Sequence, residues 1–303
     1  AGNAKKFAVE GPLWAAMSAT TYNLAVGGTG APTLASFEPN VFNFQNSNKV
    51  ALGVFDLFFV LGASKDTDGT YTSGSGGVMI YKIEGCSIGS ASIDFDIEGI
   101  AQVAWSGNGK LITEQASLNT AAGGETTKGL INEGITSTTN FIRQKLTDLA
   151  IAYDASESTG DTTGIGSSDI TYSLTLTGGN ITIENNLTYL TPESLGTVNQ
   201  PLGHVMGTRS VSGNFTCYLN DVSNGSADLF ENLVESTGLI TNAFALTFGI
   251  GGSGNTPSVD VAIPKAHLEL PSHSIDDVIG IEVNFHGLSS DLSSATASSS
   301  ANE

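Results

Sequence analysis

Three acidic residues alternate with apolar ones in the segment SIDFDIEG, which covers residues 92–99. Asp94, Asp96 and Glu98 share one parity, and carboxylate oxygens are the ligands that Ca²⁺ prefers. In an extended strand, however, the side chains of one face lie about 7 Å apart, whereas the ligands of a calcium loop curl around the ion. The pattern therefore favours a solvated acidic stripe along a strand over a calcium site.

Histidine and carboxylate residues also occur together near the C-terminus. His267 and Glu269 would share one face of a strand, and His273 follows shortly after them. These residue types are used as metal ligands, but no third ligand stands at a spacing known from metal sites. Histidines on a surface or rim are the favoured interpretation, so no metal is predicted.

The sequence lacks the motifs of nucleophilic catalysis and of phosphate binding. It has no G-x-S-x-G elbow, no P-loop and no Rossmann fingerprint followed by a helix. The run GIGGSG at 249–254 stands between two expected strands, which is the wrong context for a phosphate site. Arg143 and Arg209 are the only arginines. We therefore expect a protein that is not an enzyme and uses no cofactor.

The charge balance excludes tight binding of nucleic acid. Thirty acidic residues face 11 basic ones, for a formal net charge of −19, so the surface repels phosphate but lets DNA pass without adhesion. Cys86 and Cys217 each stand in a strand-like run, which favours buried free thiols. No window of apolar residues is long enough for a membrane span, and a soluble protein folded in a reducing compartment is expected.

The elements that would position these residues are mostly strands. Of 303 residues, 40% are hydrophobic and 37 are glycines, which favours strands and turns over helices. Two strands around a Gly-Gly turn are predicted within 170–190. Short helices are predicted at 137–150 and at 224–237, the latter with Ser226 as its N-cap.

One segment, GHVMGTRSVSGNFTCYLN at 203–220, is predicted to be a strand of unusual length. One parity is mainly apolar and the other carries hydroxyl and amide groups, as in a half-buried strand. The polar parity makes this segment a candidate assembly strand, whose polar residues and neighbouring arginine are Thr208, Arg209, Ser210, Ser212, Asn214 and Thr216.

The two halves of the chain end in similar strand series, which suggests an internal duplication. Each series has an apolar strand, a Gly/Ser/Thr-rich hairpin, a second strand, and a closing strand that ends in an aromatic residue and then x-Gly. The alternative is that β-meanders resemble one another. The alignment pairs Trp105 with Phe285, Val103 with Val283, Gln102 with Glu282, and Gly107 with Gly287.

From residue 170 to 288 the chain resembles the major tail tube proteins of long-tailed bacteriophages. The resembling order is a hairpin, a proline-containing loop, the strand GTRSVSGNFTCYL, a short helix at SADLFENLVE, and a last strand pair that ends in EVNFHG. The first half matches only through the internal repeat. These features are patterns of elements, not a chemical signature.

The resemblance implies a mainly β fold of two tandem β-sandwich or barrel domains with short helices, and a structural protein of the virion tail, assembled in the host cytoplasm. Such proteins join edge strands into rings and stack the rings into a tube for DNA ejection. Implied partners are further copies of the chain, initiator or baseplate and terminator proteins, and a sheath as a further candidate. DNA crosses the lumen without specific binding, and no membrane is involved.

Domain boundaries and ring symmetry follow from the repeat. The expected division is an N-terminal domain at 1–115, a linker with a short helix at 116–165, a C-terminal domain at 166–290 and a flexible tail at 291–303. Because family rings commonly present six domains, a two-domain chain would form a trimer with pseudo-sixfold symmetry. The acids predicted to face the lumen are Asp94, Asp96, Glu98, Glu184 and Glu282. The alternative function is another β-rich assembly or surface module, such as a decoration protein, an adhesin or a carbohydrate-binding domain.

Overall fold

The structure is a computed structural model of the chain. It describes residues 11–19, 23–24, 37–38, 42–44, 52–62, 70–74, 78–119, 144–154, 169–190, 203–235, 244–251, 259–275 and 279–288.

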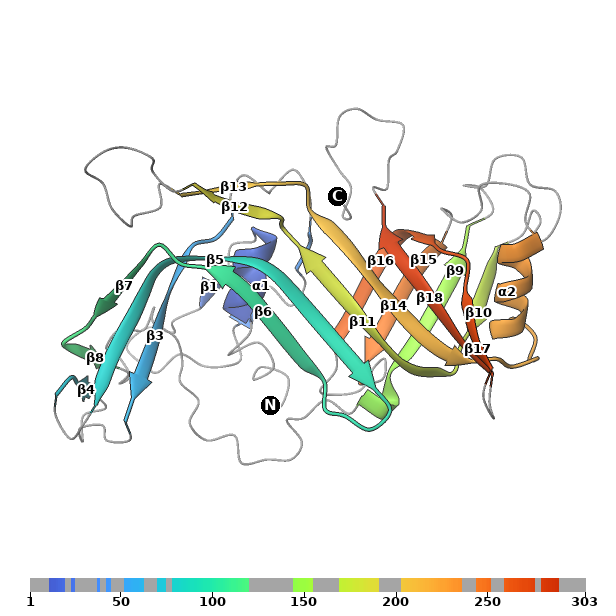
Figure 1. The fold of residues 1–303 in the computed structure, drawn as a ribbon, viewed down its shortest axis with the longest axis horizontal. Helices are drawn as coiled ribbons and strands as arrows, with labels where there is room; N and C mark the ends of the chain where they lie inside the picture. Colours follow the sequence, from blue (N-terminus) through green and yellow to red (C-terminus); the bar gives the residue numbers. More distant parts are fainter. Residues whose placement is uncertain are drawn as a thin grey trace.

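The described residues form a mainly β fold, as the composition predicts (Figure 1). One large antiparallel sheet has the order β10-β9-β15-β16-β18-β14-β11-β5-β3, with β6 and β7 on β5 and β17 on β18; β1 pairs with β2, β4 with β8, and β12 with β13. The strands are β1 (Asn23–Leu24), β2 (Phe37–Glu38), β3 (Phe55–Leu61), β4 (Thr70–Thr72), β5 (Met79–Asp96), β6 (Gln102–Asn108), β7 (Leu111–Glu114), β8 (Ser117–Asn119), β9 (Asp148–Tyr153), β10 (Ile170–Ser173), β11 (Leu176–Glu184), β12 (Leu187–Leu190), β13 (Gly203–Met206), β14 (Ser210–Tyr218), β15 (Phe244–Ile250), β16 (Val259–Leu268), β17 (Ser272–Ile275) and β18 (Ile279–Gly287).

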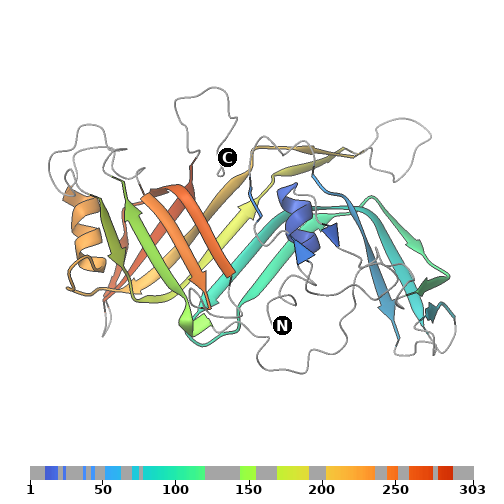
Figure 2. The same cartoon turned by 180° about the vertical axis from the view of Figure 1, so that it is seen from behind.

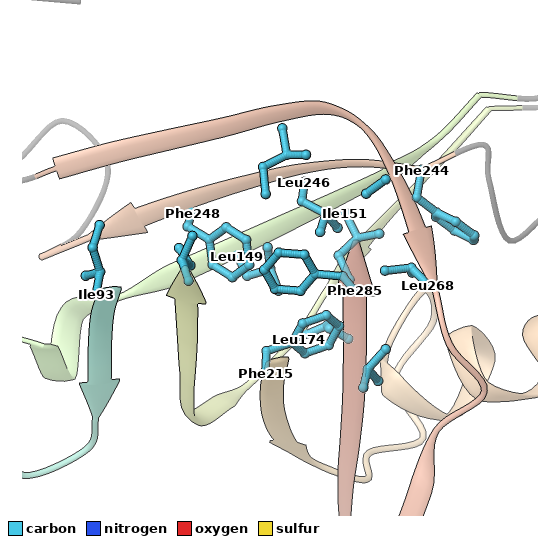
Figure 3. Close-up of a cluster of buried hydrophobic side chains, with 14 of the residues drawn as sticks. Ile93, Leu149, Ile151, Leu174, Phe215, Phe244, Leu246, Phe248, Leu268 and Phe285 are labelled. Carbon is cyan, nitrogen blue, oxygen red and sulfur yellow. The ribbon is translucent and has the colours of Figure 1, made fainter. Parts of the chain in front are cut away.

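The sheet curls so that two layers enclose the main core. Strands β11, β14 and β18 form the near layer in Figure 1, together with β5 and β6, while β16, β15 and β9 lie behind them. Figure 2 shows the second layer from its own side. Aromatic rings from both layers fill the interior (Figure 3): Phe285 lies 5.5 Å from Phe248 and 6.5 Å from Phe215, measured between ring centroids. All three side chains are fully buried, so burial of this apolar area is the main stabilising term.

Strand β5 joins the two ends of the molecule. Its first half pairs with β3 and β7, and its second half pairs with β6 and β11. Gly85, with φ 62°, stands between the two halves, a conformation that favours glycine. Beyond this bend a smaller core forms from Val78, Ile80 and Leu118.

Two helices complete the fold. Helix α1 (Gly11–Ser18) packs against β5. The ring centroid of its Trp14 lies 4.5 Å from that of Trp105 in β6. Helix α2 (Ser226–Glu235) lies beside β10, with Leu229 and Leu233 buried, as its apolar spacing predicts. Neither helix has the length and apolar character needed to span a bilayer, within the described residues. The Ser226 hydroxyl is not an N-cap, because it donates to Tyr218 O (2.7 Å) and accepts from Asn220 N (2.8 Å).

The predicted helix at 137–150 is wrong where the structure describes it. Residues 137–143 lie outside the described residues, Gln144–Leu146 form a single 3₁₀ turn, and strand β9 starts at Asp148. In β9, Leu149, Ile151 and Tyr153 alternate with exposed residues and are buried, so the period-2 pattern prevails.

The single strand predicted over 203–220 is also wrong. It is two strands, β13 and β14, separated at residues 207–209. At Gly207 a Cβ atom would lie 2.8 Å from Asn186 O, and the Gly207 amide donates to that same oxygen at 2.9 Å. This close approach turns the chain, so β13 pairs with β12 outside the main sheet.

The predicted Gly-Gly turn does not form either. Gly178 and Gly179 lie within β11, where a Cβ on Gly179 would stand 2.5 Å from Asn214 O. These glycines therefore permit close strand packing instead of a turn.

Candidate functional site

The outer face of the near layer is polar across four consecutive strands. Strand register places Asp94 of β5 beside Asn180 of β11, then Asn214 of β14 and Asn284 of β18. The adjoining row holds Ser92, Thr182, Ser212 and His286. We call this surface the polar face. Its reverse side is the core, because the intervening residues such as Ile93, Ile181 and Phe285 are buried.

Neutral amides hold two of the acids of the polar face. Asn180 Nδ2 donates to Asp94 Oδ1, and Asn214 Nδ2 donates to Glu282 Oε1 at 2.9 Å. Amide donors orient a carboxylate without cancelling its charge. The sequences of β6, β11, β14 and β18, and of β5 from residue 87 onward, contain no lysine or arginine. The face therefore keeps its negative potential.

A second group of side chains borders the polar face. Glu269 accepts from Asn284 Nδ2 at 2.9 Å and lies 3.3 Å from His286 Nε2. The hydrogen bond from Asn284 and that from His286 lower the pKa of Glu269, which keeps this carboxylate ionised. His267 stands opposite His286 in the register of β16 and β18. Among the described residues, no group of three or more His, Cys, Asp or Glu side chains is arranged to hold a metal.

The structure brings together four of the five predicted acids. Asp94, Glu184 and Glu282 are exposed on the polar face, and Asp96 ends β5 on the same side. Asp96 Oδ1 accepts the backbone N–H groups of Glu98 (2.9 Å) and Gly99, so it also shapes the turn after β5. Glu98 is exposed in that turn and lies outside the strand.

The residues of the predicted assembly strand separate into two groups. Ser210, Ser212, Asn214 and Thr216 lie on the polar face, half-exposed. Strand β14 pairs with β11 on one side and β18 on the other, so both of its backbone edges are used within the chain. Thr208 is exposed before the strand, whereas Arg209 is 4% exposed and points inward.

Sequence reasoning missed the asparagine row formed by Asn180, Asn214 and Asn284. The alternation of polar and apolar residues along each strand shows that these three asparagines stand at polar positions. Their alignment with Asp94 depends on the register between strands, which is set by tertiary packing and cannot be read from the alternation.

The sequence of this chain is similar to those of known proteins. The family model for phage tail tube proteins matches residues 15–287. The chain is 30% identical over 286 residues to the tail tube protein pb6 of Escherichia phage T5, covering 92% of this chain and 54% of that protein. The chain thus spans about half the length of this relative.

Among solved structures, one similar chain comes from the tail of an empty GTA particle with C6 symmetry. It shares 15% sequence identity and covers 46% of this chain and 90% of its own length, with a TM-score of 0.28. Because the family model extends over most of the sequence and the T5 relative is similar over nearly all of it, this chain belongs to the phage tail tube protein family.

Proposed function

We propose that this chain polymerises as stacked rings into a phage tail tube, with the polar face lining the lumen through which DNA is ejected. The observation that carries this proposal is an acid-bearing face whose strands, counting β5 from residue 87 onward, contain no lysine or arginine. DNA phosphates are repelled by such a surface and find no lysine or arginine on these strands, so DNA slides past it.

The side-chain chemistry of the face supports the same use. Hydroxyl and amide groups bond to one another across strands, as Asn180 Nδ2 does to Ser92 Oγ (2.7 Å) and Thr177 Oγ1 does to Thr216 Oγ1 (2.8 Å). Donors satisfied within the sheet are less available to phosphate oxygens. Asp94, Asp96, Glu184 and Glu282 are the acids we assign to the lumen, with Glu98 at its margin.

We also propose that the chain is an internal duplication whose ring is a trimer with pseudo-sixfold symmetry. Strands β3, β5 and β6 form an antiparallel series, and so do β15, β16 and β18. Trp105 and Phe285, which the sequence repeat aligns, both pack on the main core. These similarities between the two halves support a division into domains at 1–115 and 166–290, joined by residues 116–165. The pairing of β5 with β11 nevertheless joins strands of both halves into one sheet.

Electron microscopy of the purified chain tests both proposals. Hollow tubes with three two-lobed subunits per ring are expected. Tubes with six chains per ring would support the tail tube proposal but contradict the trimeric ring. A chain that stays dispersed, even with the tail initiator complex present, would contradict the tube itself. In the assembled virion, the initiator or baseplate, the terminator and a sheath are the proposed partners.

A further inference from the structure

An apolar surface lies at the end of the molecule formed by β3, β5 and β7, on the left of Figure 1. Strand register aligns Leu57, Phe59 and Leu61 of β3 with Ile83, Tyr81 and Met79 of β5, and Ile83 with Ile112 of β7. We call this surface the β3–β5–β7 face. Its exposed fractions are high for hydrophobic residues: Leu57 39%, Phe59 44%, Leu61 53%, Met79 42% and Ile112 66%.

The reverse side of β3 is largely apolar too, with Asp56 as its one charged residue. Phe58 and Val60 pack there against the small core of Val78, Ile80 and Leu118. Strands that are apolar on both sides are typical of sheets covered on both sides, whereas a strand with one solvated side alternates apolar and polar residues. The near layer follows that second pattern, but β3 does not. An apolar surface of this kind marks an interaction site.

Charge indicates which partner this face accepts. The chain carries a net charge of −19, so two copies repel each other unless they meet where acids are few. Among the described residues, Glu114 is the one carboxylate aligned with the β3–β5–β7 face, and it accepts from Ser73 Oγ at 3.1 Å. Asp56 and Glu84 are instead bound to Lys82, at 2.8 and 3.1 Å, on the other side of the strands.

We propose that the β3–β5–β7 face is a contact with a second copy of this chain. The inference rests on the proposed function, because assembly into a tube supplies the second copy. It adds the location of one assembly surface and places that surface apart from the polar face.

The test compares two variants that each place a glutamate at an exposed apolar position. Phe59→Glu charges the β3–β5–β7 face, and Val234→Glu charges α2, where Val234 is 54% exposed. Sedimentation velocity measures self-association, and circular dichroism checks the fold. Phe59→Glu is expected to need about tenfold or more protein for half-assembly, because a charge at a contact must be desolvated. Val234→Glu is expected to assemble like the parent chain.

The outcomes separate the face from the proposed function. Equal assembly of Phe59→Glu and Val234→Glu would overturn the proposal. Where Phe59→Glu does not fold, Met79→Glu repeats the test on the neighbouring strand. If both fail to fold while Val234→Glu folds, the chain itself covers the face, and the proposal is wrong. A parent chain that associates without forming tubes contradicts only the proposed function, and one that stays monomeric contradicts both.

Discussion

Arg209 links helix α1 to the main sheet from inside the molecule. Its Nη2 donates to Met17 O at 2.9 Å and its Nε donates to Asn185 Oδ1 at 2.7 Å. Asn185 donates to the same Met17 oxygen at 3.1 Å and to Ile88 O at 3.2 Å. The carbonyl end of a helix lacks intrahelical partners and favours a cation. Arg209 and Asn185 therefore together satisfy Met17 O at the end of α1, and Asn185 also ties this end to Ile88 of β5.

We expect Arg209→Lys to lower the free energy of unfolding by about 1.5 to 3 kcal/mol. Lysine keeps the charge but lacks the planar fork that reaches Met17 O and Asn185 Oδ1 together. Urea denaturation of the dispersed chain measures the change. Lys145→Arg, at an exposed position, is the control and is expected to change stability by less than about 0.5 kcal/mol. Equal effects would show that the Arg209 contacts contribute little.

Cys217 makes stability depend on pH in the alkaline range. The thiol is 1% exposed, and burial raises its pKa from 9.0 to about 11. The thiol of the unfolded chain therefore ionises first as pH rises, and ionisation favours unfolding. This contribution to stability is complete below pH 9.0 and is lost as the pH rises to about 11.

Cys217→Ala is therefore expected to reduce the loss of stability between pH 9 and pH 11 by about 2 to 3 kcal/mol. The measurement is urea denaturation of both chains at each pH. Alanine leaves a cavity, so the variant has lower stability at neutral pH, and only the pH dependence tests the prediction. Tyr172, whose pKa is raised to about 12 by burial, remains in both chains. If the pH dependence of stability is the same in Cys217→Ala as in the parent chain, groups other than Cys217 cause the loss of stability at alkaline pH.

At the scale of elements, alternation predicts which side of a strand is buried. In β18 the buried residues Ile281, Val283 and Phe285 follow period 2, and the prediction of a strand ending in EVNFHG is confirmed. The interruption at Gly207 could not be predicted, because it depends on the backbone of Asn186, which lies opposite Gly207 where β11 and β12 pair with β14 and β13. The same limit applies to Gly179, whose neighbours Asn214 and Phe95 come from β14 and β5.

Gly213 shows how closely the central strands approach one another. A Cβ at this position would collide with Asn180 O of β11 and lie 2.7 Å from Phe285 Cζ. We expect Gly213→Ala to lower the free energy of unfolding by about 1 to 3 kcal/mol, because the core cannot expand without strain. The control is Gly89→Ala in β5, whose Cβ would lie 3.6 Å from Ser106 O. The midpoint temperature of thermal denaturation should fall strongly for Gly213→Ala but not for Gly89→Ala. Similar decreases for the two variants would contradict the packing argument.

At the scale of the whole molecule, the sequence could predict the mainly β fold and the tail tube family, both of which are confirmed. It could also name acids such as Asp94 and Glu282, since each stands at a polar strand position. It could not show that β5 and β11 bring acids from both halves onto one face, because this requires a pairing between residues 88 positions apart. Their assignment to a lumen remains a proposal that charge can test.

Reversing charges on the polar face should turn a passive tube into one that retains DNA. The variant Asp94→Lys, Glu184→Lys, Glu282→Lys is matched by Asp221→Lys, Glu231→Lys, Asp260→Lys, whose residues are exposed elsewhere. Each set moves the formal charge from −19 to −13. Net charge is therefore equal, and only the location differs. Lysines facing a lumen bind phosphates and release counterions, so retention should weaken steeply with salt.

The measurement is the fraction of short double-stranded DNA that co-sediments with assembled tubes at low and at physiological salt, with electron microscopy to confirm that tubes form. The polar-face variant is expected to retain at least about tenfold more DNA at low salt than the control variant and to lose most of it at physiological salt. The control presents its lysines on other surfaces, where DNA adsorbs outside the tube and a nuclease digests it, whereas DNA held in the lumen is protected. Equal, nuclease-sensitive retention by both variants would place the polar face on the outer wall and would overturn its assignment to the lumen.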